Sequence, residues 1–358
     1  MDNVKDIKPF LDTIGAVEGT SFSYNEGAIK AEYAKQHKSR SNLVIKVFSV
    51  FGILFATFAF FGFLALLGIY ESELGMLLLG SILMVLSLLL NIKFDTLIID
   101  TFGASIYVLG IVLVIFGLAS FDMHEDLITL LVISIALCTL FIVQNYIVSF
   151  ISVLIIASCF LVLIFSNDLF ELLHFYLTFY ALALAYCFFN EPLFLTSGTK
   201  MSKIYGPLRI GLIFSLLFGL IAIGNYRLAP LSQNINWISS LVIIVIILYL
   251  VGSIAKTLGV DSKKTKIWIY TLTGLTLLPT LFAPSISGAL LIVLLSFRVH
   301  HKTGLGIGVV ALIYFVVQYY YDLNLTLLVK SMLLFSSGVV FVLFYLFLTK
   351  KSRGNEKV

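Results

Sequence analysis

Long apolar runs separated by short polar breaks dominate the chain from residue 43 onward. Most of them have about the 17 to 25 residues that a helix needs to cross the hydrocarbon core of a bilayer. The weakest run, 285–297, lies beside Pro279 and Pro284, so the pair 267–297 is predicted to form either two crossings or a re-entrant hairpin. The pattern predicts an all-α, polytopic transmembrane bundle of about twelve helices, at 43–68, 74–90, 102–120, 127–143, 147–165, 169–189, 210–224, 235–255, 267–283, 285–297, 303–320 and 323–348.

Polar residues prevail on both sides of this predicted transmembrane domain, which covers 43–348. Residues 1–42 are predicted to be a cytoplasmic leader, and 349–358 a basic cytoplasmic tail. The leader is too small for a domain core and is interpreted as a cap or a partner-docking element. It contains the spacing i, i+3, i+4, i+7 of an amphipathic helix, in Ile7, Phe10, Leu11 and Ile14.

Composition supports a membrane protein, because 60% of the residues are apolar and only 12% are charged. A soluble domain carries about 25% charged residues. The composition therefore excludes a soluble enzyme and a nucleic-acid-binding protein, and it makes the lipid bilayer the first expected partner.

Basic residues also predict the orientation of the bundle. A twelve-helix arrangement places 21 of the 23 Lys and Arg residues in the termini and in the loops on the side of the termini. The alternate loops hold acidic residues, with Arg227 as their one basic residue. Positive charge is retained on the cytoplasmic side of membranes, so both termini are predicted to be cytoplasmic.

Lys330 is the clearest candidate functional residue, because it falls inside the last apolar run, where an ionisable side chain is costly. Asp322, Thr326 and Lys330 are spaced i, i+4, i+8 and share one helix face. Tyr319 and Tyr320 end the preceding helix nearby. Two interpretations stay open: a lysine that extends to the interface or forms a structural ion pair, and a ligand or proton site. Asp322 is the first expected partner of Lys330, and Glu171 the second.

Two further polar groups lie at predicted outer helix ends. Glu171 and His174, at i, i+3, form either a proton-relay or metal-binding pair or an ordinary polar helix end. An acidic loop could bind a cation or serve only to set topology, and it comprises Asp122, His124, Glu125 and Asp126. His300 and His301 are interpreted as part of the inner-loop charge. The sequence lacks the HExxH, GxSxG and GxxxxGK[ST] motifs, so a zinc protease, a serine hydrolase and a P-loop protein have no support. No cofactor and no metal site is assigned from the sequence.

Gly211, Ser215 and Gly219 repeat every four residues along one predicted helix. Small residues at this spacing let a neighbouring helix approach closely, so we expect them to pack against other helices.

The C-terminal part of the sequence resembles a bacterial integral-membrane family catalogued as domain of unknown function 4401. The residues that carry the resemblance form an Ala-Pro hairpin, a Tyr-Tyr pair and a Leu-x-x-Thr-Leu-Leu-x-Lys-Ser stretch followed by a glycine. The family usually has Gly after Ala-Pro, where this chain has Ser285. The resemblance implies a multi-pass protein of the bacterial inner (cytoplasmic) membrane without an established activity. Its residues are Ala283, Pro284, Tyr319, Tyr320, Leu323, Thr326, Leu327, Leu328, Lys330, Ser331 and Gly338.

Three functional hypotheses follow. The favoured one is a non-enzymatic envelope component that works with partner membrane proteins. The second is a secondary transporter of a solute or ion, with Lys330 near the path. The third is an intramembrane enzyme that acts on a lipid or a lipid-linked substrate. A transporter is expected to show matching broken helices in its two halves, and the sequence has Pro279 and Pro284 in one half only.

Overall fold

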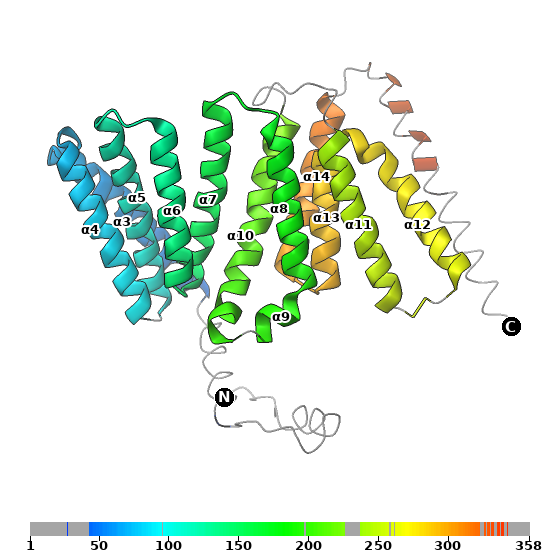
Figure 1. Cartoon of the computed structure of the whole chain (residues 1–358), viewed down its shortest axis with the longest axis horizontal. Helices are drawn as coiled ribbons and strands as arrows, with labels where there is room; N and C mark the ends of the chain where they lie inside the picture. Colours follow the sequence, from blue (N-terminus) through cyan, green and yellow to red (C-terminus); the bar gives the residue numbers. More distant parts are fainter. Residues whose placement is uncertain are drawn as a thin grey trace. The chain divides into compact units, whose positions relative to one another are not determined.

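The computed structural model describes residue 27, residues 43–94, 96–196, 198–225, 237–257, 259–260 and 262–322, and scattered positions between 326 and 342. Figure 1 shows these residues as a series of helices. No strand occurs in the described part of the chain, in agreement with the predicted all-α class. The leader (apart from Gly27), the tail 349–358 and Lys330 lie outside the described residues, so their predicted roles stay predictions.

The chain divides into two units, Met1–Gly117 and Leu118–Val358. The described part of the first unit consists of α3 (Leu43–Leu66), the 3-10 turn η2 (Ile69–Glu71), α4 (Glu73–Lys93) and α5 (Leu97–Ser120), whose last turn passes the boundary. Helix α4 begins where the Ser72 hydroxyl accepts a hydrogen bond from the backbone N–H of Gly75, at 3.1 Å.

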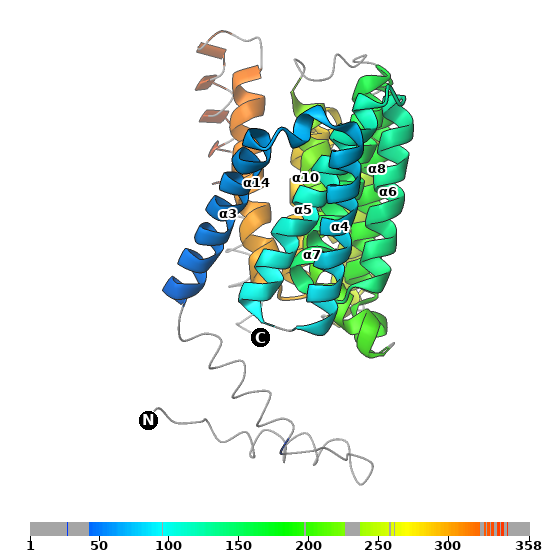
Figure 2. The same cartoon turned by 90° about the vertical axis from the view of Figure 1, so that its left-hand side faces the viewer.

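Helices α4 and α5 lie side by side in both views (Figures 1 and 2), because small residues let their backbones meet. A Cβ atom added to Gly80 would lie 2.8 Å from the carbonyl oxygen of Gly110, and the reverse distance is the same. The Ser87 hydroxyl donates to the carbonyl of Gly103 at 2.6 Å. Small residues at a helix contact let two backbones approach this closely, as is common in membrane helix pairs.

The second unit contains most of the described helices. It comprises α6 (Glu125–Ile142), α7 (Tyr146–Ser166), α8 (Leu172–Phe189), α9 (Glu191–Thr196), α10 (Thr199–Gly224), α11 (Trp237–Thr257), α12 (Lys263–Leu277), the 3-10 helix η3 (Leu278–Phe282), α13 (Pro284–Arg298) and α14 (Lys302–Asp322). Its apolar core lies where α8, α10, α11 and α13 meet, and fully buried side chains there include Leu177, Leu216, Ile247 and Leu291.

The predicted packing role of the small residues on α10 is confirmed. A Cβ atom on Gly211 would lie 2.8 Å from Val153 of α7, and one on Gly219 would lie 2.6 Å from the ring of Tyr176 on α8. Ser215, between them, is fully buried. We call Gly211, Ser215 and Gly219 the α10 seam, since they hold α7 and α8 to α10.

Within the described residues, eleven of the twelve predicted runs coincide with a helix. The twelfth, 323–348, falls mostly outside them, and the short helix α9 was not predicted. Eight described helices are long and apolar enough to cross a membrane: α4, α5, α6, α7, α8, α10, α11 and α14. The chain is therefore a membrane protein by helix length and composition, while twelve crossings with cytoplasmic termini stay a prediction.

The hairpin at 267–297 is helical throughout most of its length. Helix α12 continues directly into η3, and Ala283 then breaks the helical backbone before Pro284 starts α13. Proline suits this place, because the first residue of a helix needs no N–H partner. Helix α13 has 15 residues and is largely buried against α11, α10 and α14. Two crossings and a re-entrant hairpin stay alternative predictions.

Candidate functional site

Helices α7 and α8 are each packed along α10, but they contact one another far less than either contacts α10. Helix α6 packs along the other side of α7. The loop from Asn167 to Glu171 joins α7 to α8 at the end where α6 begins. An opening therefore remains between α7 and α8 on the side away from α10.

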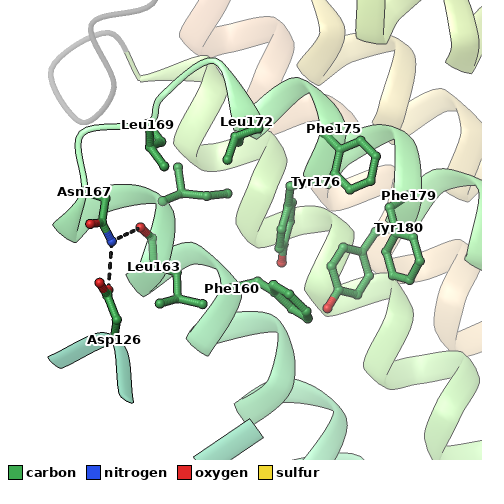
Figure 3. A pocket seen from close by; sticks show the side chains of 11 residues that line it. Asp126, Phe160, Leu163, Asn167, Leu169, Leu172, Phe175, Tyr176, Phe179 and Tyr180 are labelled. Atoms are coloured by element: carbon green, nitrogen blue, oxygen red, sulfur yellow. Dashed lines mark hydrogen bonds between the residues drawn. The ribbon is translucent and has the colours of Figure 1, made fainter. Parts of the chain in front are cut away.

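This opening is a groove of about 620 Å³, shown in Figure 3. Apolar and aromatic side chains form nearly all of its wall. Phe175 and Phe179 of α8 stand at its exposed side, 70% and 53% exposed, whereas Tyr176 and Tyr180 are buried. The complete lining is Asp126, Phe160, Leu163, Ile164, Asn167, Leu169, Leu172, Phe175, Tyr176, Phe179 and Tyr180.

Tyr176 fixes the inner wall of the groove. Its hydroxyl donates to the backbone carbonyl of Ser215 in the α10 seam at 2.9 Å. Its ring lies 4.5 Å from that of Tyr180, centroid to centroid, and Phe179 packs edge-on against Tyr180 at 5.3 Å. A buried phenol with a satisfied hydroxyl is a rigid apolar surface, so this wall is preformed.

The groove ends in two polar side chains. The Asn167 amide nitrogen donates to Asp126 Oδ1 at 2.8 Å and to the carbonyl of Leu163 at 3.0 Å. The first bond connects the end of α7 to the first turn of α6, whereas the second stays within the last turn of α7; Figure 3 shows both of them at one end of the aromatic wall. We call this end of the second unit the Asp126 end.

A second pocket, of about 530 Å³, adjoins the groove and shares Asp126 and Asn167 with it. Its remaining lining brings together the acidic loop that the sequence singled out. Asp122, His124 and Glu125 all contribute, together with Ala119, Met123, Ile128 and Ser166. Among these lining residues, Asp122, Glu125 and Asp126 are acidic and none is Lys or Arg.

Local structure explains why this loop folds as it does. Asp122 adopts a left-handed backbone conformation, with φ at 55°, which Asp tolerates better than most residues. His124 Nδ1 accepts from the backbone N–H of Asp126 at 3.4 Å and so caps α6. Glu125 and Asp126 fall in the first turn, where negative charge is favourable.

Glu171 and His174 lie at the N-cap and in the first turn of α8, and their predicted joint role stays a prediction. Glu171 is exposed at the start of α8, whereas His174 is buried. His174 Nδ1 lies 3.1 Å from the hydroxyl of Ser239 on α11, a contact that the sequence did not predict. Its Nε2 atom is buried without a hydrogen-bond partner among the described residues. The part of the chain that the structure describes holds no group of three or more His, Cys, Asp and Glu suited to a metal.

Lys330 lies outside the described residues, so the structure describes only some members of the predicted cluster around it. Asp322 and Tyr319 are exposed at the end of α14. The ring of Tyr320 packs edge-on against Tyr321 at 5.6 Å. Thr326 accepts a hydrogen bond from the backbone N–H of Val329 at 3.4 Å. The pairing of Lys330 with Asp322 stays a prediction.

Sequence reasoning missed an ion pair near the opposite end of α8. Arg209 Nη1 lies 3.2 Å from Glu191 Oε1, and the guanidinium packs over the rings of Tyr205 and Phe188. The sequence suggested only inner-loop charge for Arg209. The unpredicted helix α9 brings Glu191 to it, so the available signal was an acidic residue at the start of that short helix.

His301 lies near this ion pair and caps α14. Its Nδ1 accepts a hydrogen bond from the backbone N–H of Gly304 at 3.0 Å. Burial, and secondarily the positive charge of Arg209, lower the pKa of His301. The fold therefore favours the neutral form of His301, and the cap gives this residue a structural role beyond inner-loop charge.

The family described as Domain of unknown function (DUF4401) matches residues 42–351 of the chain. The chain belongs to this family. The match confirms the resemblance seen in the sequence and covers every described helix from α3 to α14. No curated protein and no solved structure matches the chain. In this member of the DUF4401 family, the groove and the adjoining pocket have the shape of a ligand site.

Proposed function

We propose that this protein is a non-enzymatic component of the bacterial cytoplasmic membrane that holds a membrane amphiphile in the groove between α7 and α8. One observation carries the proposal: an apolar groove and a polar pocket share Asp126 and Asn167 at their junction. A membrane amphiphile matches this arrangement, because its apolar chain is joined to a polar head group. In the orientation predicted from the positive charges, the Asp126 end lies at the outer side of that membrane.

The groove has the size and lining of a ligand site. Its volume falls in the range of about 300–1,000 Å³ that small-molecule sites occupy. The aromatic wall offers apolar contact to a chain that enters sideways from the bilayer, and the rigid ring of Tyr176 limits the entropic cost of binding. The lining supplies no Ser, Cys, His or Lys side chain, so it is suited to holding a chain rather than to cleaving one.

Photo-cross-linking tests this function. The full-length protein is reconstituted in bilayers that contain a lipid with a diazirine in its acyl chain, and labelled peptides are mapped by mass spectrometry. We expect labelling to concentrate on the groove residues of α7 and α8, including Phe160 and Tyr180. Labelling spread evenly over the other exposed faces of the second unit would contradict the proposal.

A matched pair of variants sharpens this test. Leu163→Trp places a large ring inside the groove, whereas Val162→Trp places it on the neighbouring exposed position outside the groove lining. We expect the first variant to lose most of the groove labelling and the second to keep it. Equal labelling of both variants would show that the lipid does not enter the groove. Cross-links to another polypeptide at these residues in native membranes would instead favour a partner-docking face.

A secondary transporter is the second candidate, and one observation favours it. His174 Nε2 and the hydroxyl of Ser240 are buried in the second unit without hydrogen-bond partners among the described residues. Buried polar atoms of this kind are usually satisfied by water, which a transport path contains. Water exchange measured at His174 by solid-state NMR tests this idea, because a transport path predicts fast exchange and a sealed bundle predicts none.

A further inference from the structure

We infer that the head group of the bound amphiphile carries a primary ammonium, as in a phosphatidylethanolamine, and that Asp126 receives it. This inference rests on the proposed function, since it names the chemistry of the ligand at the same groove. The groove ends at Asp126, where the lining carries negative charge and hydrogen-bond acceptors.

Asn167 and Asp126 determine which hydrogen bonds a ligand can form at the junction of groove and pocket. An asparagine amide has two N–H donors, and Asn167 directs them to Asp126 Oδ1 and to the carbonyl of Leu163, with the Ser166 hydroxyl as a further acceptor at 3.3 Å. The remaining capacity of Asn167 is its carbonyl oxygen, an acceptor. Asp126 is likewise an acceptor, and its second carboxylate oxygen, Oδ2, lies 3.4 Å from Nδ1 of His124. Because that Nδ1 accepts the backbone N–H of Asp126, it does not donate to Oδ2. The junction of groove and pocket therefore offers acceptors and requires a ligand that donates.

The charge of the pocket lining also restricts the head group of the ligand. The pocket lining holds three carboxylates, those of Asp122, Glu125 and Asp126, and no Lys or Arg. His124 faces Asp126 within this lining, and its side chain is 72% exposed. The Asp126 side chain is only 32% exposed, so it is more sheltered than that of His124, and salt screens its charge less. Complementarity therefore favours a cationic head and disfavours an anionic one.

An alkylammonium meets both requirements, because it is positive and has three N–H donors. In a zwitterionic amine lipid the ammonium is the outermost group of the head. The ammonium can therefore reach Asp126 while the phosphate stays hydrated and the acyl chain follows the Phe175 and Phe179 side of α8. A quaternary ammonium has the positive charge but no N–H donors, so a lipid that carries it tests the role of charge separately from the role of hydrogen bonding.

The experiment uses the full-length protein in nanodiscs made from phosphatidylethanolamine, phosphatidylcholine or phosphatidylglycerol with identical acyl chains. A trace of the same lipid carries the chain diazirine, and the yield of groove labelling is measured. We expect at least about fivefold more labelling with the ethanolamine lipid than with the glycerol lipid, as one partly exposed charge-assisted hydrogen bond gives. We expect the choline lipid to fall clearly below the ethanolamine lipid.

Asp126→Asn should reduce this preference to about one, because it removes the charge and can still accept the Asn167 hydrogen bond. Asp168→Asn is the matched control: it removes an exposed carboxylate from the α7–α8 loop, outside both linings, and Asn tolerates the left-handed backbone there, with φ at 53°. It should leave the preference unchanged. The comparison of lipids on the unaltered protein needs no variant and stands if Asp126→Asn does not fold.

The outcomes separate the two proposals. Equal groove labelling from all three lipids, or a preference that Asp126→Asn leaves intact, would overturn the ammonium assignment and leave the groove function standing. Choline labelling equal to ethanolamine labelling would overturn the requirement for N–H donors. No groove labelling from any lipid would overturn the proposed function itself.

Discussion

The two sides of α8 show opposite ways of using the space between helices. Toward α10 the α10 seam lets side chains of α8 pack directly on the α10 backbone, and a Cβ atom on Gly219 would lie 2.6 Å from the ring of Tyr176 and 2.8 Å from the side chain of Leu177. Toward α7, large rings keep a groove of about 620 Å³ open. Small residues close one contact, and bulky residues that cannot interdigitate leave the other open.

Tyr176 belongs to both sides, and this position links them. Its ring packs on Gly219 and lines the groove, while its hydroxyl donates to the Ser215 carbonyl. The seam therefore sets where the inner wall of the groove stands. Changes in the seam should alter both stability and lipid binding, and changes in the outer groove should alter binding alone.

The largest effect is expected from Gly219→Leu. The new side chain would have to displace the Tyr176 ring, so we expect a loss of about 3 kcal/mol of stability, the upper range for an overpacked core. Groove labelling should fall as well, because the wall moves. The thermal unfolding midpoint in detergent and the cross-linking yield measure the two effects.

Gly306→Ala is the matched control for that variant. Gly306 lies within α14, and a Cβ atom there meets nothing within 4 Å. Replacing a helical glycine by alanine should raise stability by about 0.5 kcal/mol and leave groove labelling unchanged. If Gly219→Leu were as well tolerated as Gly306→Ala, the close approach of α8 and α10 would be wrong.

A smaller effect is expected from Tyr176→Phe. The ring and the groove lining remain, and only the hydrogen bond to Ser215 is lost. We expect about 1 kcal/mol of destabilisation, the usual net value of one buried hydrogen bond. Lipid labelling should stay close to that of the unaltered protein. A loss of labelling as large as that of Leu163→Trp would show that the hydroxyl itself, rather than the ring, shapes the groove.

The smallest effect concerns His301, far along the sequence from the groove. Because its pKa is lowered in the folded protein, the unfolded chain binds more protons as the pH falls below about 6.5. The contribution of His301 to the free energy of unfolding is therefore fully present above about pH 6.5 and declines as the pH falls below that value.

His301→Asn should remove this decline and keep the cap on α14, since asparagine is a good N-cap acceptor. Unfolding midpoints measured from pH 7.5 to pH 5.5 compare the variant with the unaltered protein. An identical acid decline in both proteins would assign it to other groups. Groove labelling at pH 7.5 should be the same in both.

The sequence predicted helices better than it predicted sites, and the reasons are physical. Apolar length determines a membrane helix, so the runs ending near Ser120 and Phe189 coincide with α5 and α8. Spacing along one helix also showed that Gly211, Ser215 and Gly219 pack against neighbours. These features depend on residues close together in the chain.

Contacts between distant segments were not visible in the same way. Asn167 meets Asp126 across 41 positions, and His174 meets Ser239 across 65. The acidic loop was recognised, but the groove beside it depends on how α7 and α8 separate around α10. Helix α9 has six residues, too few to give a periodic signal, so the partner of Arg209 was missed.

The most direct test of the groove is an experimental structure of the protein in a phosphatidylethanolamine bilayer, determined by electron cryomicroscopy. We predict an elongated chain density along Phe175 and Phe179, packed on Tyr176 and Tyr180, with a head group at Asp126. A groove closed by contact between α7 and α8, or one filled by a helix of another polypeptide, would contradict this account.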